Sequence, residues 1–238
     1  MKKVVISGTD VPVSGTGVSE DQLDHALASS VLGRWLRSME KFAATYPVES
    51  IEVTAVDYRG RPGPTMVMFV RLRIKAANAP FAQIVELRGD TVVMLPVFRS
   101  EGRDYTVLVI QPRIAVGDTA LVEVPAGMVD GGTFAGAVAH ELEEELGMTF
   151  SVEELIELSP ETILFSPGLL DEGARFYAVV REMGREELTT LQGKATGLVE
   201  EGEKITLHVV PLDELLSHTR DGKALIALAL YNAHLAKK

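Results

Sequence analysis

Apolar positions recur along the chain at two spacings, one typical of helices and one typical of strands. Ser19 and Gln22 form a capping-box pattern, and apolar residues then follow at helical spacing. This pattern predicts a helix that runs to about Thr45 and ends before Pro47. A second helical pattern ends at Gly147, a residue type that commonly stops helices.

Stretches rich in β-branched and apolar residues, bounded by glycine and proline, predict strands. The first two long stretches are separated by Gly60, Pro62, Gly63 and Pro64, so we expect a hairpin. The expected strands are Met1–Ile6, Ile51–Asp57, Thr65–Ile74, Phe81–Leu87, Thr91–Pro96, Thr106–Gln111, Val152–Glu157, Glu161–Leu164 and Arg175–Arg181. Two closing helices are expected at Asp213–Ser217 and Lys223–Leu235.

The order of these elements predicts an α+β protein with two parts. We place the boundary near Gly89, where the N-terminal helix and hairpin give way to a mixed sheet flanked by helices. The expected domains are therefore residues 1–88 and 89–238. No internal repeat or low-complexity tract interrupts either part.

The second helical pattern carries four acidic residues in five positions, which are Glu141, Glu143, Glu144 and Glu145. On a helix the side chains of Glu141, Glu144 and Glu145 share one face, whereas Glu143 points elsewhere. Acidic runs are often solvated helix faces. No lysine or arginine lies between Val129 and Met148 to relieve the repulsion, however, and three convergent carboxylates suit a hard cation such as Mg²⁺.

Composition narrows the functional classes. The chain has 238 residues, of which 46% are hydrophobic and 24% charged, and this is ordinary globular material. A formal net charge of -11 argues against a surface for nucleic acid or anionic membrane, which needs clustered lysine and arginine. The absence of cysteine excludes disulfides and fits a reducing compartment, so we expect a cytoplasmic protein. No apolar run is long enough to span a bilayer.

The acidic segment resembles the signature box of the Nudix hydrolases. The run from Glu141 to Met148 matches the second half of that box well. In the first half, Thr133 stands where the family has a glutamate, and the loop is one residue shorter than the family spacing. His140 stands where the family has an arginine that supports a box carboxylate, so this support could be weaker or depend on pH.

Further segments extend the resemblance to the branch that cleaves nucleoside-diphosphate sugars. They are Gln111-Pro112-Arg113, Leu121 to Gly127, Ser166-Pro167-Gly168 with Asp171-Glu172, Glu201 to Ile205, and Val209 to Leu215. The stretch Ser29–Leu36 and Met128 are similar to a subgroup that hydrolyses ADP-sugars. The resemblance implies a Nudix fold, in which a mixed sheet is sandwiched between helices, with a smaller N-terminal region of a helix and a β-hairpin.

The resemblance also implies a metal site for Mg²⁺, with Mn²⁺ as the alternative. Its ligands would be the carboxylates of Glu141, Glu144 and Glu145 together with the backbone carbonyl of Ala126. Gly127 would allow the tight turn that this carbonyl requires. Divalent cations neutralise a diphosphate and make water nucleophilic, which is what cleavage of a pyrophosphate needs.

Four side chains receive roles in catalysis or substrate binding, each with an alternative. Glu172 would activate or orient the attacking water, and Glu144 is the competing base. Arg113 would bind a phosphate or a group near the ribose, or it is a surface arginine. Glu123 would accept a hydrogen bond from adenine or a sugar, or it is a strand residue paired with a nearby arginine.

We therefore expect a Mg²⁺-dependent hydrolase that cleaves ADP-ribose or ADP-glucose to AMP and a sugar phosphate. A pyrophosphatase for UDP-sugars is one alternative, because no base-reading residue is identifiable. A catalytically weak binding module is another, because of His140 and the missing glutamate of the box. The resemblance further implies a homodimer that associates through residues 1–88.

Overall fold

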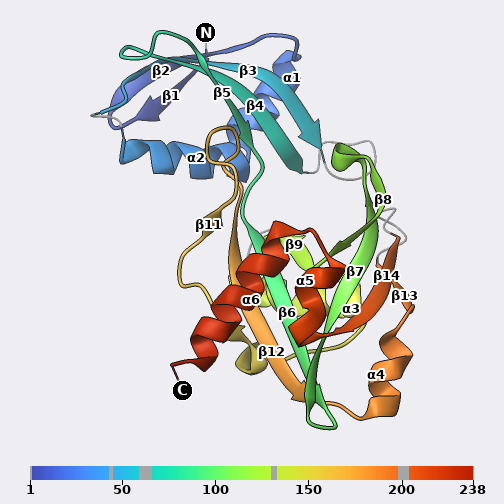
Figure 1. The fold of residues 1–238 in the computed structure, drawn as a ribbon. Coiled ribbons are helices and arrows are strands. Elements are labelled where there is room, and N and C mark those ends of the chain that lie inside the picture. The colour runs from blue at the N-terminus through green and yellow to red at the C-terminus, as the bar shows by residue number, and fades with distance from the viewer. Residues whose placement is uncertain (1, 43–44, 59–65, 130–132, 198–203, 238) are drawn as a thin grey trace. The chain divides into compact units, whose positions relative to one another are not determined.

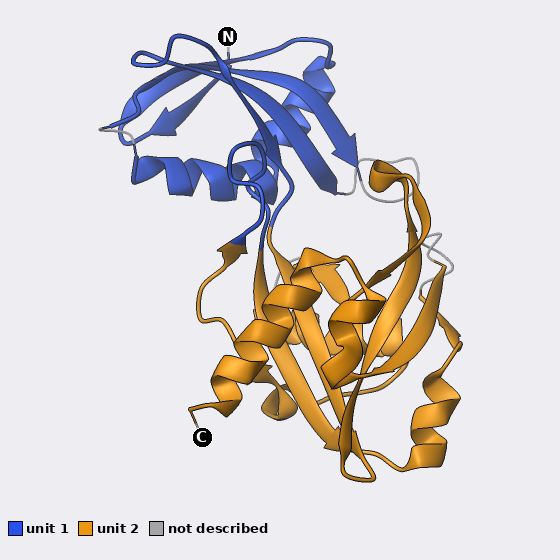
Figure 2. Cartoon of the chain, viewed as in Figure 1, with its two compact units in different colours: residues 1–89, 164–173 blue, residues 90–163, 174–238 orange. Residues whose placement is uncertain are grey.

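The computed structural model describes residues 2–42, 45–58, 66–129, 133–197 and 204–237, and it divides into two compact units (Figures 1 and 2). The first unit consists of Met1–Gly89 and Leu164–Gly173, and the second of Asp90–Ile163 and Ala174–Lys238. The sequence predicted a division into residues 1–88 and 89–238. It did not predict that Leu164–Gly173 belongs to the first unit.

The first unit is built on a five-stranded sheet with the order β1-β2-β3-β4-β5. The strands are β1 Lys2–Ile6, β2 Thr9–Gly15, β3 Val48–Tyr58, β4 Val67–Ala76 and β5 Gln83–Leu87. Strands β2 and β3 pair in parallel, and the other neighbours are antiparallel. The hairpin of β3 and β4 confirms the prediction, although its separating residues 60–64 lie outside the described part. Strand β2 was not predicted.

Two helices pack on this sheet, α1 Glu20–Ala28 and α2 Ser30–Glu40. The capping box of Ser19 and Gln22 is confirmed at the start of α1. The expectation of a single helix to about Thr45 is wrong, because Ser29 has an extended backbone with φ -73 and ψ 146. Its hydroxyl accepts a hydrogen bond from the Leu32 amide, so Ser29 ends one helix and caps the next.

The segment Leu164–Gly173 belongs to the first unit because its backbone pairs with strand β5. The Glu86 amide donates to the Leu169 carbonyl at 2.8 Å, and the Asp171 amide donates to the Glu86 carbonyl at 3.2 Å. An isolated bridge joins Glu86 to Leu170 in parallel. A segment distant in sequence therefore covers part of the edge of the sheet.

The described residues of the second unit form a nine-stranded mixed sheet. Its main path is β10-β12-β6-β7-β14-β13, with β8 paired to β7, β9 to β6 and β11 to β12. The strands are β6 Thr91–Ser100, β7 Arg103–Arg113, β8 Asp118–Glu123, β9 Ala126–Met128, β10 Ile156–Glu157, β11 Ile163–Leu164, β12 Gly173–Glu182, β13 Ala195–Thr196 and β14 Ile205–Pro211. Central strands β6 and β12 run parallel.

Helices cover both faces of this sheet. They are α3 Phe134–Leu146, α4 Arg185–Leu191, α5 Leu215–His218 and α6 Gly222–Leu235. Helices α3 and α4 pack on the face that bears Val92 and Met94, whereas α5 and α6 pack on the face that bears Val93 and Leu95. Successive residues of β6 thus enter opposite cores, which explains why its sequence is apolar without alternation.

Short elements depart from the prediction in several places. The expected strand Val152–Glu157 is a 3-10 turn, Val152–Glu154, followed by the two residues of β10, and only the end of Glu161–Leu164 is a strand. Helix α4 and strand β13 were not predicted. Among the described residues, no helix is both long and apolar enough to span a membrane.

A chain of hydrogen bonds joins α4, β14 and α5 through two histidines. The Gln192 side-chain oxygen accepts from the Val209 amide at 2.7 Å, so its NH₂ group faces Nδ1 of His208 at 3.3 Å. His208 must then carry its proton on Nε2, which lies 3.3 Å from Nδ1 of His218. This arrangement uses the neutral form of His208. Burial, and then the neighbouring His218, lower the pKa of His208 below its ordinary value of 6.5.

This lowered pKa predicts a loss of stability in mild acid. Below pH 6.5 the unfolded chain binds a proton at position 208 that the folded protein resists, so the free energy of unfolding falls until the pH passes the lowered pKa. We expect His208→Gln to reduce the fall between about pH 7.5 and about pH 5. Urea unfolding of both proteins at each pH measures the difference, and an equal fall in both would contradict the assignment.

Candidate functional site

Helix α3 carries the acidic run and is fixed at both ends. The Thr133 hydroxyl accepts a hydrogen bond from the Gly136 amide at 3.1 Å and caps the start of the helix. Gly147 ends it in the left-handed region with φ 66, as the sequence predicted. The side chains of Val138, Leu142 and Leu146 are fully buried against the sheet. The apolar stripe therefore sets the direction in which the carboxylates point.

Two carboxylates of α3 contact the short strand β9. The Ala126 amide donates to Oε2 of Glu145 at 3.2 Å, and Glu145 is buried. Glu141 lies against Gly127 so closely that a Cβ atom there would be 1.8 Å from its carboxyl carbon. Consecutive residues of β9 thus meet side chains from successive turns of one helix. A side chain at position 127 would therefore displace the Glu141 carboxylate from this place.

The third carboxylate of this face is supported by the helix itself. Nδ1 of His140 lies 3.1 Å from Oε2 of Glu144, four positions further along α3. The His140 side chain is exposed, whereas that of Glu144 is only 20% exposed. This histidine thus contacts a box carboxylate, as the resemblance implies for the arginine of the family. Glu143 is exposed, which agrees with its predicted direction.

The residues near β9 fit a hard divalent cation in their chemistry. Glu141, Glu144 and Glu145 offer only oxygen donors, which Mg²⁺ and Mn²⁺ prefer. The close approach of Glu141 to Gly127 brings a carboxylate against the backbone of Ala126 and Gly127, the loop expected to supply a carbonyl ligand. In their present rotamers, no three acidic or histidine side chains of the described residues are grouped to hold a metal ion.

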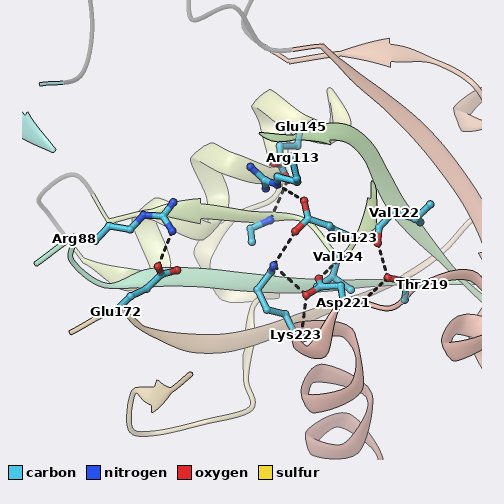
Figure 3. A network of polar contacts seen from close by, with 11 residues as sticks. Arg88, Arg113, Val122, Glu123, Val124, Glu145, Glu172, Thr219, Asp221 and Lys223 are labelled. Atoms are coloured by element: carbon cyan, nitrogen blue, oxygen red, sulfur yellow. Dashed lines mark hydrogen bonds and ion pairs between the residues drawn. The ribbon is translucent and has the colours of Figure 1, made fainter. Parts of the chain in front are cut away.

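A buried ionic network lies at the ends of β7 and β8 (Figure 3). Nε of Arg113 donates to Oε2 of Glu123 at 2.5 Å, and Nζ of Lys223 donates to Oε1 at 3.0 Å. Glu123 is buried, so its charge needs these partners. Glu123 lies at the end of strand β8 and pairs with an arginine. Only Val124 and Pro125 separate Glu123 from Ala126, which bonds to Glu145.

Sequence reasoning missed the two members of this network that come from α6. Asp221 caps the helix through the Lys223 amide at 3.0 Å, and it accepts from the Val124 amide at 3.3 Å. An acidic residue before an apolar helix is a capping signal, and it could have identified Asp221. No local pattern could have identified Lys223, because its partner Glu123 lies 100 positions away.

Glu172 lies in the first unit, whereas the carboxylates of α3 lie in the second. Its side chain is only 15% exposed, because Nη1 of Arg88 donates to Oε2 at 2.6 Å. Arg88 also lies over the Phe69 ring, 5.5 Å from its centre. Glu172 is therefore held by an arginine and is largely shielded from solvent.

The neighbouring Asp171 ties the same loop to its unit. Its carboxylate accepts from Nη2 of Arg34 and from the Arg88 amide, both at 2.7 Å. Arg34 is part of α2, and Arg88 follows β5. The Ser-Pro-Gly loop is consequently joined to two separate elements of the first unit by Asp171, in addition to its backbone bonds with β5.

Comparisons with known proteins agree on the kind of domain present. Residues 87–228 match the model of the NUDIX domain. Over 236 residues the chain is 33% identical to Nudix hydrolase 14, chloroplastic, of Arabidopsis thaliana, covering 93% of this chain and 76% of that protein. Over 141 residues it is 33% identical to the ADP-ribose pyrophosphatase of Escherichia coli K12, covering 57% of this chain and 62% of that one.

A solved structure described as an ADP compounds hydrolase has a similar fold. It matches with a TM-score of 0.53 over 81% of this chain and 95% of its own, at 16% sequence identity. Identity this low supports the fold alone.

The contact between Gly127 and Glu141 predicts the effect of a single added methyl group. In Gly127→Ala the Cβ atom would displace the Glu141 carboxylate, so we expect Mn²⁺ binding to weaken by about tenfold or more. Because the displaced atoms are the far end of a flexible side chain, the midpoint of thermal unfolding should change little. Calorimetric titration with Mn²⁺ and thermal unfolding measure both effects.

The matched control is Gly184→Ala, because an added Cβ at Gly184 meets no atom within 4 Å. Its Mn²⁺ affinity should equal that of the wild type. Unchanged cation affinity in Gly127→Ala would show that Glu141 is not a ligand.

Proposed function

The chain belongs to the Nudix family of hydrolases, and we propose that it hydrolyses the pyrophosphate bond of ADP-sugars such as ADP-ribose and ADP-glucose. The products are AMP and a sugar phosphate. One observation carries the proposal, namely that Glu141 and Glu145 of one helix lie against Gly127 and Ala126 of one strand. This arrangement gathers oxygen donors beside a backbone loop, which suits a cation bound to a diphosphate.

The residues that would hold the cation are Glu141, Glu144 and Glu145, with the Ala126 carbonyl. Mg²⁺ is the proposed ion and Mn²⁺ the alternative. A bound divalent cation neutralises the negative oxygens of a diphosphate and lowers the pKa of water. His140 supports Glu144 at 3.1 Å, and this contact favours an enzyme over a weak binding module.

Arg113 is proposed to bind the phosphate or the ribose side of the substrate. Its side chain is 40% exposed and only its Nε meets Glu123, so the rest of the planar guanidinium is available to an anion. Glu123 is proposed to support Arg113, since both of its oxygens already accept from cations. This role replaces a direct contact of Glu123 with adenine or a sugar.

Either of two carboxylates, Glu172 or Glu144, is proposed to orient or activate the attacking water. Glu172 has this role by resemblance, and its contact with Arg88 fixes the direction of its carboxylate. Glu144 is the alternative, because it sits among the proposed ligands on α3. A base must accept a proton within hydrogen-bond reach, and an ionised carboxylate can do so.

The choice of an ADP-sugar rests on the relatives. A protein that is 33% identical to this chain over 141 residues carries the name ADP-ribose pyrophosphatase. UDP-sugar hydrolysis remains the alternative substrate class. We also propose that residues 1–88 form a homodimer, as the resemblance implies. The cytoplasmic location stays a prediction, since one similar protein is named as chloroplastic.

Direct turnover measurements test the substrate class. We expect purified protein with Mg²⁺ to release AMP from ADP-ribose and ADP-glucose faster than it releases UMP from UDP-glucose. Chromatography of the products at several substrate concentrations gives kcat/KM for each compound. A preference for UDP-glucose would assign the protein to the alternative class, and binding of ADP-ribose without release of AMP would make it a binding module.

Neighbouring glutamates of α3 offer a matched pair of variants. Glu145→Gln removes a proposed ligand charge, and it should lower kcat/KM by more than about 100-fold, because even outer-shell partners of metals cost about 10–100-fold. Glu143→Gln removes the same charge from an exposed position on the same helix. It should leave turnover near the wild-type value. Equal effects of the two variants would show that the cation is held elsewhere.

A further inference from the structure

The Glu123 carboxylate is shared between two cations, one on each oxygen. Oε2 accepts from Nε of Arg113 and Oε1 accepts from Nζ of Lys223 (Figure 3). The Glu123 side chain is only 6% exposed, so neither contact is a loose surface pair. Nζ of Lys223 also lies 3.1 Å from Oδ1 of Asp221, whose side chain is 7% exposed. Two acids and two cations thus form a locally neutral group.

An arginine and a carboxylate with no other partner favour a bidentate pair, in which two N–H groups face two oxygens. Lys223 competes with this geometry, because its ammonium group already donates to the second oxygen of Glu123. Within the described residues, Arg113 meets Glu123 through Nε alone. The two terminal nitrogens of its guanidinium, with four N–H donors, therefore stay available.

The position of Lys223 is itself unusual. It lies in the first turn of α6, where the helix dipole favours acids over bases. Asp221 offsets part of this cost as the capping residue, and it also binds the Val124 amide. A lysine that is unfavourable for its own helix and directed at a buried carboxylate indicates a specific task.

We propose that Lys223 is a positioning residue, which holds Oε1 of Glu123 and so keeps the terminal nitrogens of Arg113 open for a phosphate of the substrate. The inference rests on the proposed function, since Arg113 is there the anion-binding residue. Without Lys223, both oxygens of Glu123 accept hydrogen bonds from Arg113. A terminal nitrogen of Arg113 then faces Glu123 instead of the substrate. The lysine acts on the substrate only through Glu123 and Arg113.

The first experiment measures binding of inorganic pyrophosphate by calorimetry, so that no turnover is required. In Lys223→Met we expect the Kd to rise by about tenfold, the size expected for the loss of one hydrogen bond to a charged group. Lys223→Arg keeps a cation beside Oε1 and should bind nearly as well as the wild type. Lys75→Met, which removes an exposed lysine paired with Glu49, is the control and should match the wild type.

A second variant separates this role from a structural one. In Glu123→Gln combined with Lys223→Met, the amide offers only one oxygen and cannot form the bidentate pair with Arg113. The double variant should therefore bind pyrophosphate more tightly than Lys223→Met alone. If Lys223 only stabilised the start of α6, the added substitution would rescue nothing. Absence of rescue, or a Lys223→Met protein with wild-type affinity, would overturn the proposal.

Steady-state kinetics with ADP-ribose distinguish this inference from the proposed function. Lys223→Met should raise KM by about tenfold while kcat changes by less than about threefold, because a ground-state contact is lost. A wild-type protein that releases no AMP refutes the proposed function. The pyrophosphate titrations of the variants still test Lys223 in that case, and a wild type that binds no pyrophosphate refutes the role of Arg113 as well.

Discussion

The contact of the Glu141 carboxylate with Gly127 is the constraint on which the candidate site depends. Since a Cβ atom at position 127 would lie 1.8 Å from the Glu141 carboxyl carbon, the carboxylate can keep this place only beside a glycine. The same approach lets the Ala126 amide reach Glu145. The apolar side of α3 is buried against the sheet, and Glu141 and Glu145 contact β9 from a neighbouring face of the helix. The packing of α3 on the sheet and the contacts of its carboxylates with β9 therefore fix the same position of the helix.

The fixed parts of this geometry could be predicted where a local pattern encodes them. The capping box of Ser19, the end of α3 at Gly147 and the acidic face of that helix all depend on residues within one or two turns. The break at Ser29 was missed because an apolar pattern continued through it, although serine competes with the helix for its own backbone. Strand β2 was also missed, since it contains both an aspartate and a proline.

Features that depend on distant residues could not be predicted. Glu123 and Lys223 are 100 positions apart, and Arg88 and Glu172 are 84 positions apart. No spacing rule connects such pairs, and the fold alone brings them together. These contacts also fix the positions of individual cations in a chain with a net charge of -11. Buried acids such as Glu123 hold individual cations in place, so local charge differs from the total.

The pairing of Leu164–Gly173 with strand β5 makes the first unit discontinuous in sequence. A ribosome that adds about 5–20 residues each second finishes β5 several seconds before it reaches Leu170. During that interval the edge of the nascent sheet lacks the backbone partner that it has in the finished protein. The ion pair of Arg34 with Asp171 likewise cannot form until Asp171 has been synthesised. The N-terminal part therefore cannot complete its folding as an independent module during translation, and its last contacts form only after much of the second unit has been synthesised.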